Sequence, residues 1–194
     1  MLSALGDERL TAKLSSGEAA LADALLRRLS AHDVAREPKD LLVLTAAALC
    51  LTRRGARLTG RLTALIQLLD EQATQLSEAD QLTQAIPLRR ERLRLLLAQG
   101  PQSSQLVSEA HAELAALLAR AGDLAGALGE YEEARRGWSV GWPSAEERVV
   151  LFKEMARLAR LVGDEGRRVA LLEAIWAVVE AEHEPTEFGA TGGR

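Results

Sequence analysis

Residues 103–138 most restrict the fold of this chain, because small and large side chains alternate there at the spacing of two closely packed helices. Gly122 divides the segment at a point where a left-handed C-terminal helix cap is favoured. Ala115 and Ala127 are small enough to let the two helices approach, and Tyr131 is large enough to fill the space beside them. The segment therefore predicts one antiparallel helical hairpin.

Helix-forming residues dominate the rest of the chain, and signals for β-strands are almost absent. Aromatic residues make up 3% of the sequence, and no Asn-Gly or Asp-Gly turn occurs. We therefore expect an all-α fold. Gly, Pro and Ser residues divide the chain into eight expected helices, at residues 17–35, 38–54, 57–76, 78–98, 103–121, 123–138, 144–162 and 164–182.

Two of these helices carry specific expectations about where they start. Ser144 and Glu147 form a capping-box pattern, which marks the N-terminus of a helix. Pro87 lies inside the expected helix 78–98, where it removes a backbone donor and clashes with the preceding turn. That helix must therefore either kink or begin later than residue 78.

The expected hairpins recur at a nearly constant interval. Their internal turns are placed near Glu37, Ser77, Gly122 and Gly163, about 40, 45 and 41 residues apart, and the last two share a Gly-Asp pair. One hairpin cannot bury its own apolar stripe, so a regular series indicates stacked units with a shared core. We expect an α-solenoid of about four antiparallel hairpins. The alternative is an irregular helical bundle with accidental spacing.

The hairpin at residues 103–138 resembles a tetratricopeptide repeat. The matching positions, large-small-large in the first helix and small-aromatic-small in the second, are Leu114, Ala115 and Leu118, followed by Ala127, Tyr131 and Ala134. The period exceeds the thirty-four residues of the standard unit by about seven, nearly one extra turn for each helix. Such units are similar to the long-helix repeats of kinesin light chain and of the helical sensor regions of large bacterial transcription activators.

The resemblance implies a right-handed superhelical array whose concave face binds a peptide or a partner helix. The first helix of each hairpin would line that face, and by register the inward positions are Glu109, Ala112, Glu113, Ala116, Arg120, Lys153, Glu154, Arg157 and Arg160. Among these, the charged residues expected to bind a partner are Glu109, Glu113, Arg120, Lys153, Arg157 and Arg160. The positive charges of the last hairpin suit an acidic partner. The alternative is an ordinary solvated stripe.

The last expected helix carries more apolar surface than a terminal helix needs. One stripe contains Val169, Leu172, Trp176 and Val179, and a second contains Leu171, Ile175 and Val178. One interpretation is a docking or self-association surface that includes Trp176, which would produce a homodimer through the C-terminal helix. The other is that the C-terminal tail or a wide groove covers these side chains.

No catalytic, cofactor or metal motif is present in the sequence. It has no His-Glu-x-x-His pair, no phosphate-binding glycine loop and no nucleophile elbow, and its three histidines fall in separate segments. We therefore expect no enzymatic activity, no cofactor and no metal ion. The sequence also contains two arginine-rich runs, Arg89, Arg90, Arg92 and Arg94 in one and Arg53, Arg54, Arg57 and Arg61 in the other. We interpret both as solvated or salt-bridged faces and not as a nucleic-acid site, because no aromatic residue interleaves with them and the net charge is −4.

The remaining features concern organisation and location. We expect a flexible N-terminus at residues 1–16, a helical-repeat domain at 17–182 and a disordered tail at 183–194. A single cysteine, no signal-peptide pattern and no apolar span of about 20 residues indicate a cytoplasmic protein without a membrane partner. Arginine outnumbers lysine 21 to 3, which is typical of a GC-rich bacterial genome. The expected function is that of a non-enzymatic adaptor or regulatory subunit, and the alternative is a ligand-sensing regulator that binds a small molecule or a signalling peptide.

Overall fold

The computed structural model describes residues 38–53, 59–100, 104–138 and 143–183 together with Ala24, and all regular structure in them is helical. The seven named helices are α3 (Pro38–Arg53), α4 (Thr59–Glu78), α5 (Leu82–Ala98), α6 (Ser104–Arg120), α7 (Leu124–Arg136), α8 (Ala145–Val162) and α9 (Glu165–His183). The all-α prediction is thus confirmed for this part of the chain. The expected helix 17–35, apart from Ala24, lies outside the described residues, as do residues 1–16 and 184–194.

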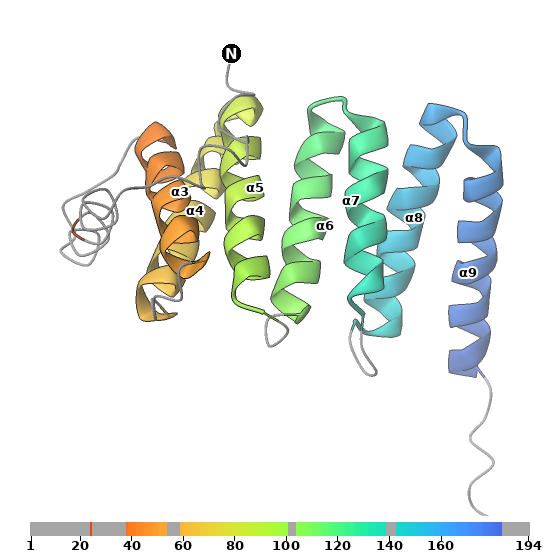
Figure 1. Cartoon of the computed structure of the whole chain (residues 1–194). Helices are drawn as coiled ribbons and strands as arrows, with labels where there is room; N and C mark the ends of the chain where they lie inside the picture. Colours follow the sequence, from red (N-terminus) through yellow and green to blue (C-terminus); the bar gives the residue numbers. More distant parts are fainter. Residues whose placement is uncertain (1–23, 25–37, 54–58, 101–103, 139–142, 184–194) are drawn as a thin grey trace, which may run out of the picture.

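The helices pack mainly against their neighbours in sequence. Helices α4 and α5, α6 and α7, and α8 and α9 form antiparallel pairs, and successive pairs meet through α5 and α6 and through α7 and α8. Figure 1 shows α5 to α9 side by side in a row, with α9 at one end and α3 beside α4 and α5 at the other.

Two of the expected turns, at Gly122 and Gly163, lie where they were expected; Ser77 belongs to α4, with the turn after it at residues 79–81, and Glu37 lies outside the described residues. Gly122 and Gly163 adopt positive φ values of 87° and 79°, the left-handed conformation that ends a helix without steric cost only for glycine. The aspartate after each glycine caps the next helix: Asp123 accepts from the Gly126 amide at 2.9 Å, and Asp164 accepts from the Arg167 amide at 2.9 Å. The repeated Gly-Asp pair thus ends one helix and starts the next.

The capping box is confirmed and the expected bounds of α5 are corrected. Ser144 Oγ accepts from the Glu147 amide, and the Glu147 carboxylate accepts from the Ser144 amide at 2.8 Å. Helix α5 begins at Leu82 instead of residue 78, after a turn in which Asp80 has a positive φ of 57°. Pro87 nevertheless remains inside the helix, so the later start does not move it into the first turn.

Two apolar clusters hold the row together. The first joins α3, α4 and α5 through side chains that include Leu41, Leu65, Leu69, Leu88 and Leu95. The second joins α5 to α9, and it contains Leu93, Leu96, Ala115, Ala127, Leu128, Tyr131, Phe152 and Met155. Ala115 and Ala127 are fully buried, as their predicted place between two closely packed helices requires.

Candidate functional site

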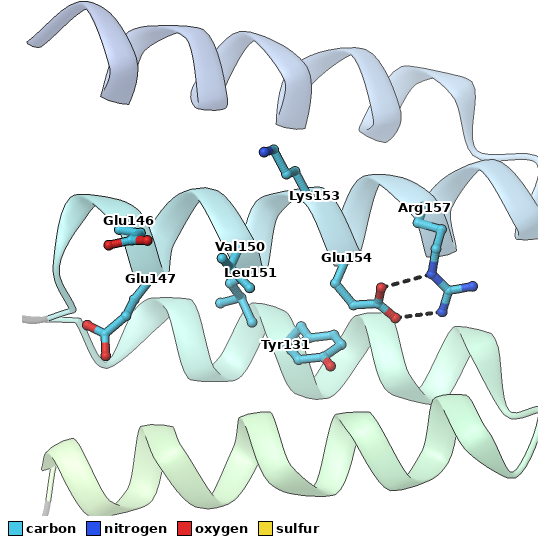
Figure 2. Close-up of a pocket in the computed structure, with 8 residues that line it drawn as sticks. All are labelled: Tyr131, Glu146, Glu147, Val150, Leu151, Lys153, Glu154 and Arg157. Atoms are coloured by element: carbon cyan, nitrogen blue, oxygen red, sulfur yellow. Dashed lines mark hydrogen bonds and ion pairs between the residues drawn. The ribbon is translucent and has the colours of Figure 1, made fainter. Parts of the chain in front are cut away.

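An open hollow of about 750 Å³ lies over α8 beside Tyr131 of α7. Figure 2 shows Val150 and Leu151 in its middle, with acidic residues toward the start of α8 and an ion pair toward its end. The surface is mainly apolar, and its lining residues are Tyr131, Glu146, Glu147, Val150, Leu151, Lys153, Glu154 and Arg157. The hollow therefore brings together three of the residues that the repeat alignment predicted on the inner face: Lys153, Glu154 and Arg157.

One face of α8 is presented to solvent along most of the helix. Its members recur at intervals of three and four residues, which places them on one side of a helix, and all are exposed: Glu146, Val150, Lys153, Arg157 and Arg160. The opposite side of α8 carries Phe152, Met155 and Leu158, all of them buried. Val150 is 64% exposed, so an apolar side chain stands among the charges of this face.

The charged groups of this face differ in how they are paired. Arg157 donates to both carboxylate oxygens of Glu154, at 2.8 and 2.6 Å. Those hydrogen bonds hold the pKa of Glu154 below its usual value, although partial burial opposes the shift. Lys153 and Arg160 have no ion-pair partner among the described residues. Their charges are therefore available to a bound molecule.

Tyr131 forms the α7 side of the hollow. It is 6% exposed, and burial raises the pKa of its phenol; the negative charge of Glu154 adds to the rise and the positive charge of Arg157 opposes it. From the sequence, Tyr131 was expected to pack between helices, and Val150 and Leu151 were not identified as site residues. The spacing of Glu146, Val150, Lys153 and Arg157 is the sequence feature that would have identified the whole face.

The predicted partner-binding residues of α6 have contacts within the molecule. Glu113 Oε2 accepts from Arg92 Nη1 at 2.6 Å and from Arg89 Nη1 at 2.8 Å. Arg120 donates to Ser77 at the end of α4, to its hydroxyl at 2.6 Å and its carbonyl at 2.9 Å, and pairs with Asp80. Glu113 and Arg120 thus connect one hairpin to the preceding one. The predicted residue Glu109 accepts from Gln105 at 3.0 Å within α6.

The first arginine run is largely committed to ion pairs. Arg89 and Arg92 are only 9% and 8% exposed, and besides Glu113 they contact Asp70 of α4. Arg92 Nε lies 3.2 Å from Asp70 Oδ1 but is not aligned as a hydrogen bond. Arg94 pairs with Glu91, and the salt-bridged interpretation is confirmed for these three arginines. The side chains of the second run, Arg53, Arg54, Arg57 and Arg61, lie outside the described residues.

The histidines do not form a metal site where their surroundings are described. His111 Nδ1 lies 2.7 Å from Glu130 Oε2, so it links α6 to α7. His32 and the side chain of His183 lie outside the described part of the chain. In that part, no group of three or more His, Cys, Asp or Glu side chains is placed to hold a metal ion, and no helix is long and apolar enough to cross a membrane.

The two apolar stripes of α9 have different surroundings. Leu171 is buried, and Ile175 and Val178 pack against the second apolar cluster. The other stripe faces solvent: Val169 and Leu172 are each 44% exposed, and Trp176 is 65% exposed. The stripe with Leu171, Ile175 and Val178 therefore attaches α9 to the rest of the protein, whereas the described residues leave the other stripe exposed.

Comparison with known proteins gives a likeness of fold. No protein-family model matches the chain, and no curated protein matches it. Among solved structures, the crystal structure of BtubC (BKLC) from P. vanneervenii superposes with a TM-score of 0.52 and 16% sequence identity, over 92% of this chain and 80% of that one. At that identity, the chain and BtubC share an arrangement of helices.

Proposed function

We propose that this chain is a non-enzymatic protein–protein interaction adaptor or regulatory subunit. In this proposal its hairpins form a tetratricopeptide-like, right-handed α-solenoid of about four units, and a peptide or partner helix binds along the first helices of the hairpins. Three observations support the architecture: the sequential pairing of α4 to α9, the repeated Gly-Asp turns, and the similarity in fold to BtubC.

The exposed face of α8 is the observation on which the proposed binding site depends. Val150, Leu151 and Tyr131 supply an apolar patch with the unpaired ammonium group of Lys153 beside it, and the unpaired guanidinium group of Arg160 lies further along the same face of α8. Peptide-binding surfaces combine such a desolvated apolar centre with a charged rim. From Glu146 to Arg160 the face runs about 21 Å, since a helix rises about 1.5 Å per residue, which accommodates roughly four turns of a partner helix. An acidic partner segment would be held by Lys153 and Arg160.

Affinity capture with the intact chain tests this proposal. The double variant Lys153→Glu/Arg160→Glu should lose the bound protein, because it turns two attractive contacts into repulsive ones. The control Arg90→Glu/Arg136→Glu makes the same change of net charge at exposed arginines of α5 and α7, and it should capture the same protein as the unmodified chain. Equal capture by both variants would show that the α8 face is not the binding site.

The size of the hollow favours a second candidate function, that of a ligand-sensing regulator. Small-molecule sites usually occupy about 300–1,000 Å³, and the hollow beside Tyr131 falls within that range at about 750 Å³. A sensor should gain several degrees in melting temperature when the low-molecular-weight fraction of a cell extract is added, because the ligand binds the folded state. An adaptor should gain stability from the macromolecular fraction alone.

A further inference from the structure

The exposed face of α8 carries two apolar side chains, one in the hollow and one beyond it. Val150 is 64% exposed, and Leu161, eleven residues further along, is 52% exposed. Eleven residues make about three turns of an α-helix, so the two side chains point in nearly the same direction, about 16.5 Å apart along the axis. Helices that bind in grooves are held by apolar anchors spaced along one face. Val150 and Leu161 are therefore two contact points for one partner.

The charged groups of this face are separated along the helix. Glu146 lies four residues before Val150, at the start of α8 in Figure 2. Lys153 and Arg160 lie between Val150 and Leu161. None of these three charged side chains has an ion-pair partner in the described part of the chain. The face is thus negative before the first apolar contact point and positive between the two.

The other charges beside this face leave that separation in place. Glu147 adds a second carboxylate at the acidic end. Glu154 and Arg157 form an ion pair with each other, so together they add no net charge. The carboxylates that follow the end of α8 are paired with arginines of α9: Asp164 with Arg167, and Glu165 with Arg168. The acidic end and the basic end of the face therefore both keep a net charge.

We infer that the partner is an amphipathic helix that lies antiparallel to α8, an inference that rests on the function proposed above. Two helices have the same rise per residue, so the spacings on α8 are repeated on the partner. The partner carries two apolar residues eleven positions apart, and the first of them contacts Leu161 while the second contacts Val150. An acidic residue in its first turn meets Arg160, and another acidic residue meets Lys153. A basic residue in its last turn meets Glu146.

The dipole of the partner helix favours the antiparallel direction. Acidic groups stabilise the first turn of a helix, and basic groups stabilise the last turn. A partner that spans the face in the antiparallel direction has its acidic residue beside Arg160 in the first turn and its basic residue beside Glu146 in the last. A partner in the parallel direction needs the opposite order, which its own dipole opposes. The charges at the two ends together change the affinity by about threefold or more.

The extent of the face determines the kind of complex. From Glu146 to Leu161 it runs about 22 Å along the helix axis. A single helix on such a face buries less than the roughly 800 Å² per partner of a standard stable interface. The complex should therefore be transient, and it should be detectable with peptide at micromolar concentrations.

Two synthetic peptides, acetylated and amidated so that their ends carry no charge, test the direction. The first has two leucines eleven positions apart, a glutamate directly after the first leucine and another three positions before the second, and an arginine four positions after the second. Alanine and glutamine fill the rest, and the second peptide has the same residues in reverse order. Fluorescence anisotropy with the full chain should show that the first peptide binds at least about threefold more tightly. Equal affinities, or tighter binding of the second peptide, would overturn the antiparallel arrangement.

Disulfide cross-linking in a Cys50→Ser background locates the ends of the bound peptide. With cysteine in place of its first leucine, the first peptide should cross-link to Leu161→Cys and not to Val150→Cys. The opposite result would mean that the peptide runs parallel to α8. A proline in the middle of the peptide should abolish binding, because it breaks the helix. Unchanged binding of the proline peptide would overturn the helical partner.

Charge exchange tests the contact with Glu146. Glu146→Lys should weaken binding of the first peptide, and replacing the peptide's arginine by glutamate should restore it. A failure to restore binding would overturn this contact. Lys153→Glu/Arg160→Glu should weaken binding of the first peptide roughly tenfold, whereas the control Arg90→Glu/Arg136→Glu should bind it normally.

The outcomes separate this inference from the proposed function. No binding of either peptide, together with affinity capture that still depends on Lys153 and Arg160, would overturn the inference and leave the adaptor function in place. Peptide binding that is equally strong in Lys153→Glu/Arg160→Glu would overturn both, because the α8 face would then not be the binding site.

Discussion

Arg92 and Glu113 are joined across the boundary between two hairpins, with Arg92 Nη1 donating to Glu113 Oε2 at 2.6 Å. Arg89 donates to the same oxygen, and both guanidinium groups are buried. The junction between α5 and α6 is therefore partly ionic, whereas α7 and α8 both contribute apolar side chains, among them Tyr131 and Phe152, to the second apolar cluster. Ionic contacts of this kind require a defined geometry, because a buried charge without its partner is costly.

Removing the shared carboxylate should destabilise the protein appreciably. Breaking a fully buried ion pair costs about 3–5 kcal/mol. We expect about 2 kcal/mol for Glu113→Ala, since the Glu113 side chain is 42% exposed and both arginines keep their contact with Asp70. Urea unfolding measures the change. The control Glu133→Ala removes the partner of a highly exposed arginine, Arg136, and should cost less than about 0.5 kcal/mol. Equal losses in the two variants would contradict a special role for the buried junction.

Two glycine-to-alanine substitutions should act in opposite directions. Gly163 has a φ of 79°, so Gly163→Ala should destabilise the protein by about 1 kcal/mol through backbone strain, even though no atom lies within 4 Å of the added Cβ. Gly129 lies exposed within α7 with equally open surroundings. Gly129→Ala should therefore stabilise it by about 0.5–1 kcal/mol, because alanine is the better helix former. The measurement is the melting temperature of each variant relative to that of the parent chain. A change of the same sign in both variants would refute the argument from backbone conformation.

Tyr131 is the single tyrosine of the chain, so its ionisation can be followed by ultraviolet absorbance. Burial, and then the charge of Glu154, raise its pKa above the usual value of about 10. Glu154→Gln should lower this pKa and Arg157→Gln should raise it. The folded state holds the phenolic proton more tightly than the unfolded state does, so stability is complete below pH 10 and falls as the pH rises through the raised pKa. An unchanged titration in both variants would mean that the three side chains do not lie together.

Substitution of two serines, Ser144 at the start of α8 and Ser108 in α6, should affect stability differently. Ser144→Ala removes the hydroxyl that caps the helix and should cost about 1 kcal/mol. Ser108→Ala removes a buried hydroxyl for which the described residues provide no hydrogen-bond partner, so it should be neutral or slightly stabilising. Chemical denaturation of the two variants under identical conditions makes the comparison. A larger loss for Ser108→Ala would indicate that its hydroxyl has a partner in solution.

The capping box also predicts a pH dependence. Hydrogen bonding to the Ser144 amide lowers the pKa of Glu147 below that of an unpaired glutamate. Its contribution is therefore present above the pKa of the unfolded chain and is lost as the pH falls through the lowered value. The Ser144 hydroxyl supplies the second and smaller part of this lowering, and Ser144→Ala removes that part while keeping the backbone amide. Carboxyl carbon NMR should therefore show Glu147 titrating at somewhat lower pH in the parent chain than in Ser144→Ala.

Features that depend on neighbouring residues in sequence were predictable. The Gly-Asp turns, the capping box and the small residues between α6 and α7 each act within one hairpin, so a single segment contains the whole pattern. The bounds of α5 were wrong because the turn before it uses a left-handed aspartate, Asp80, where no glycine marks the end of α4.

Features that depend on contacts between hairpins were not predictable from the sequence alone. Arg89 and Arg92 resemble a surface run, and their burial depends on Asp70 and Glu113, which come from the helices before and after α5. The patch around Val150 also required the structure, because it includes Tyr131 from α7. Periodicity identified both stripes of α9, but it did not show which one faces the core.

Helix α5 belongs to both apolar clusters, since Leu88 and Leu95 enter the first while Leu93 and Leu96 enter the second. With this arrangement the two ends of the row can unfold locally as separate cooperative units. The backbone amides of α3 and α4 can exchange with solvent while those of α6 to α9 remain protected, and the amides of α6 to α9 can exchange while those of α3 and α4 remain protected. A force or a ligand applied at one end would therefore be felt at the other through the movement of α5 and through the direct hydrogen bonds of Arg120 in α6 to Ser77 in α4.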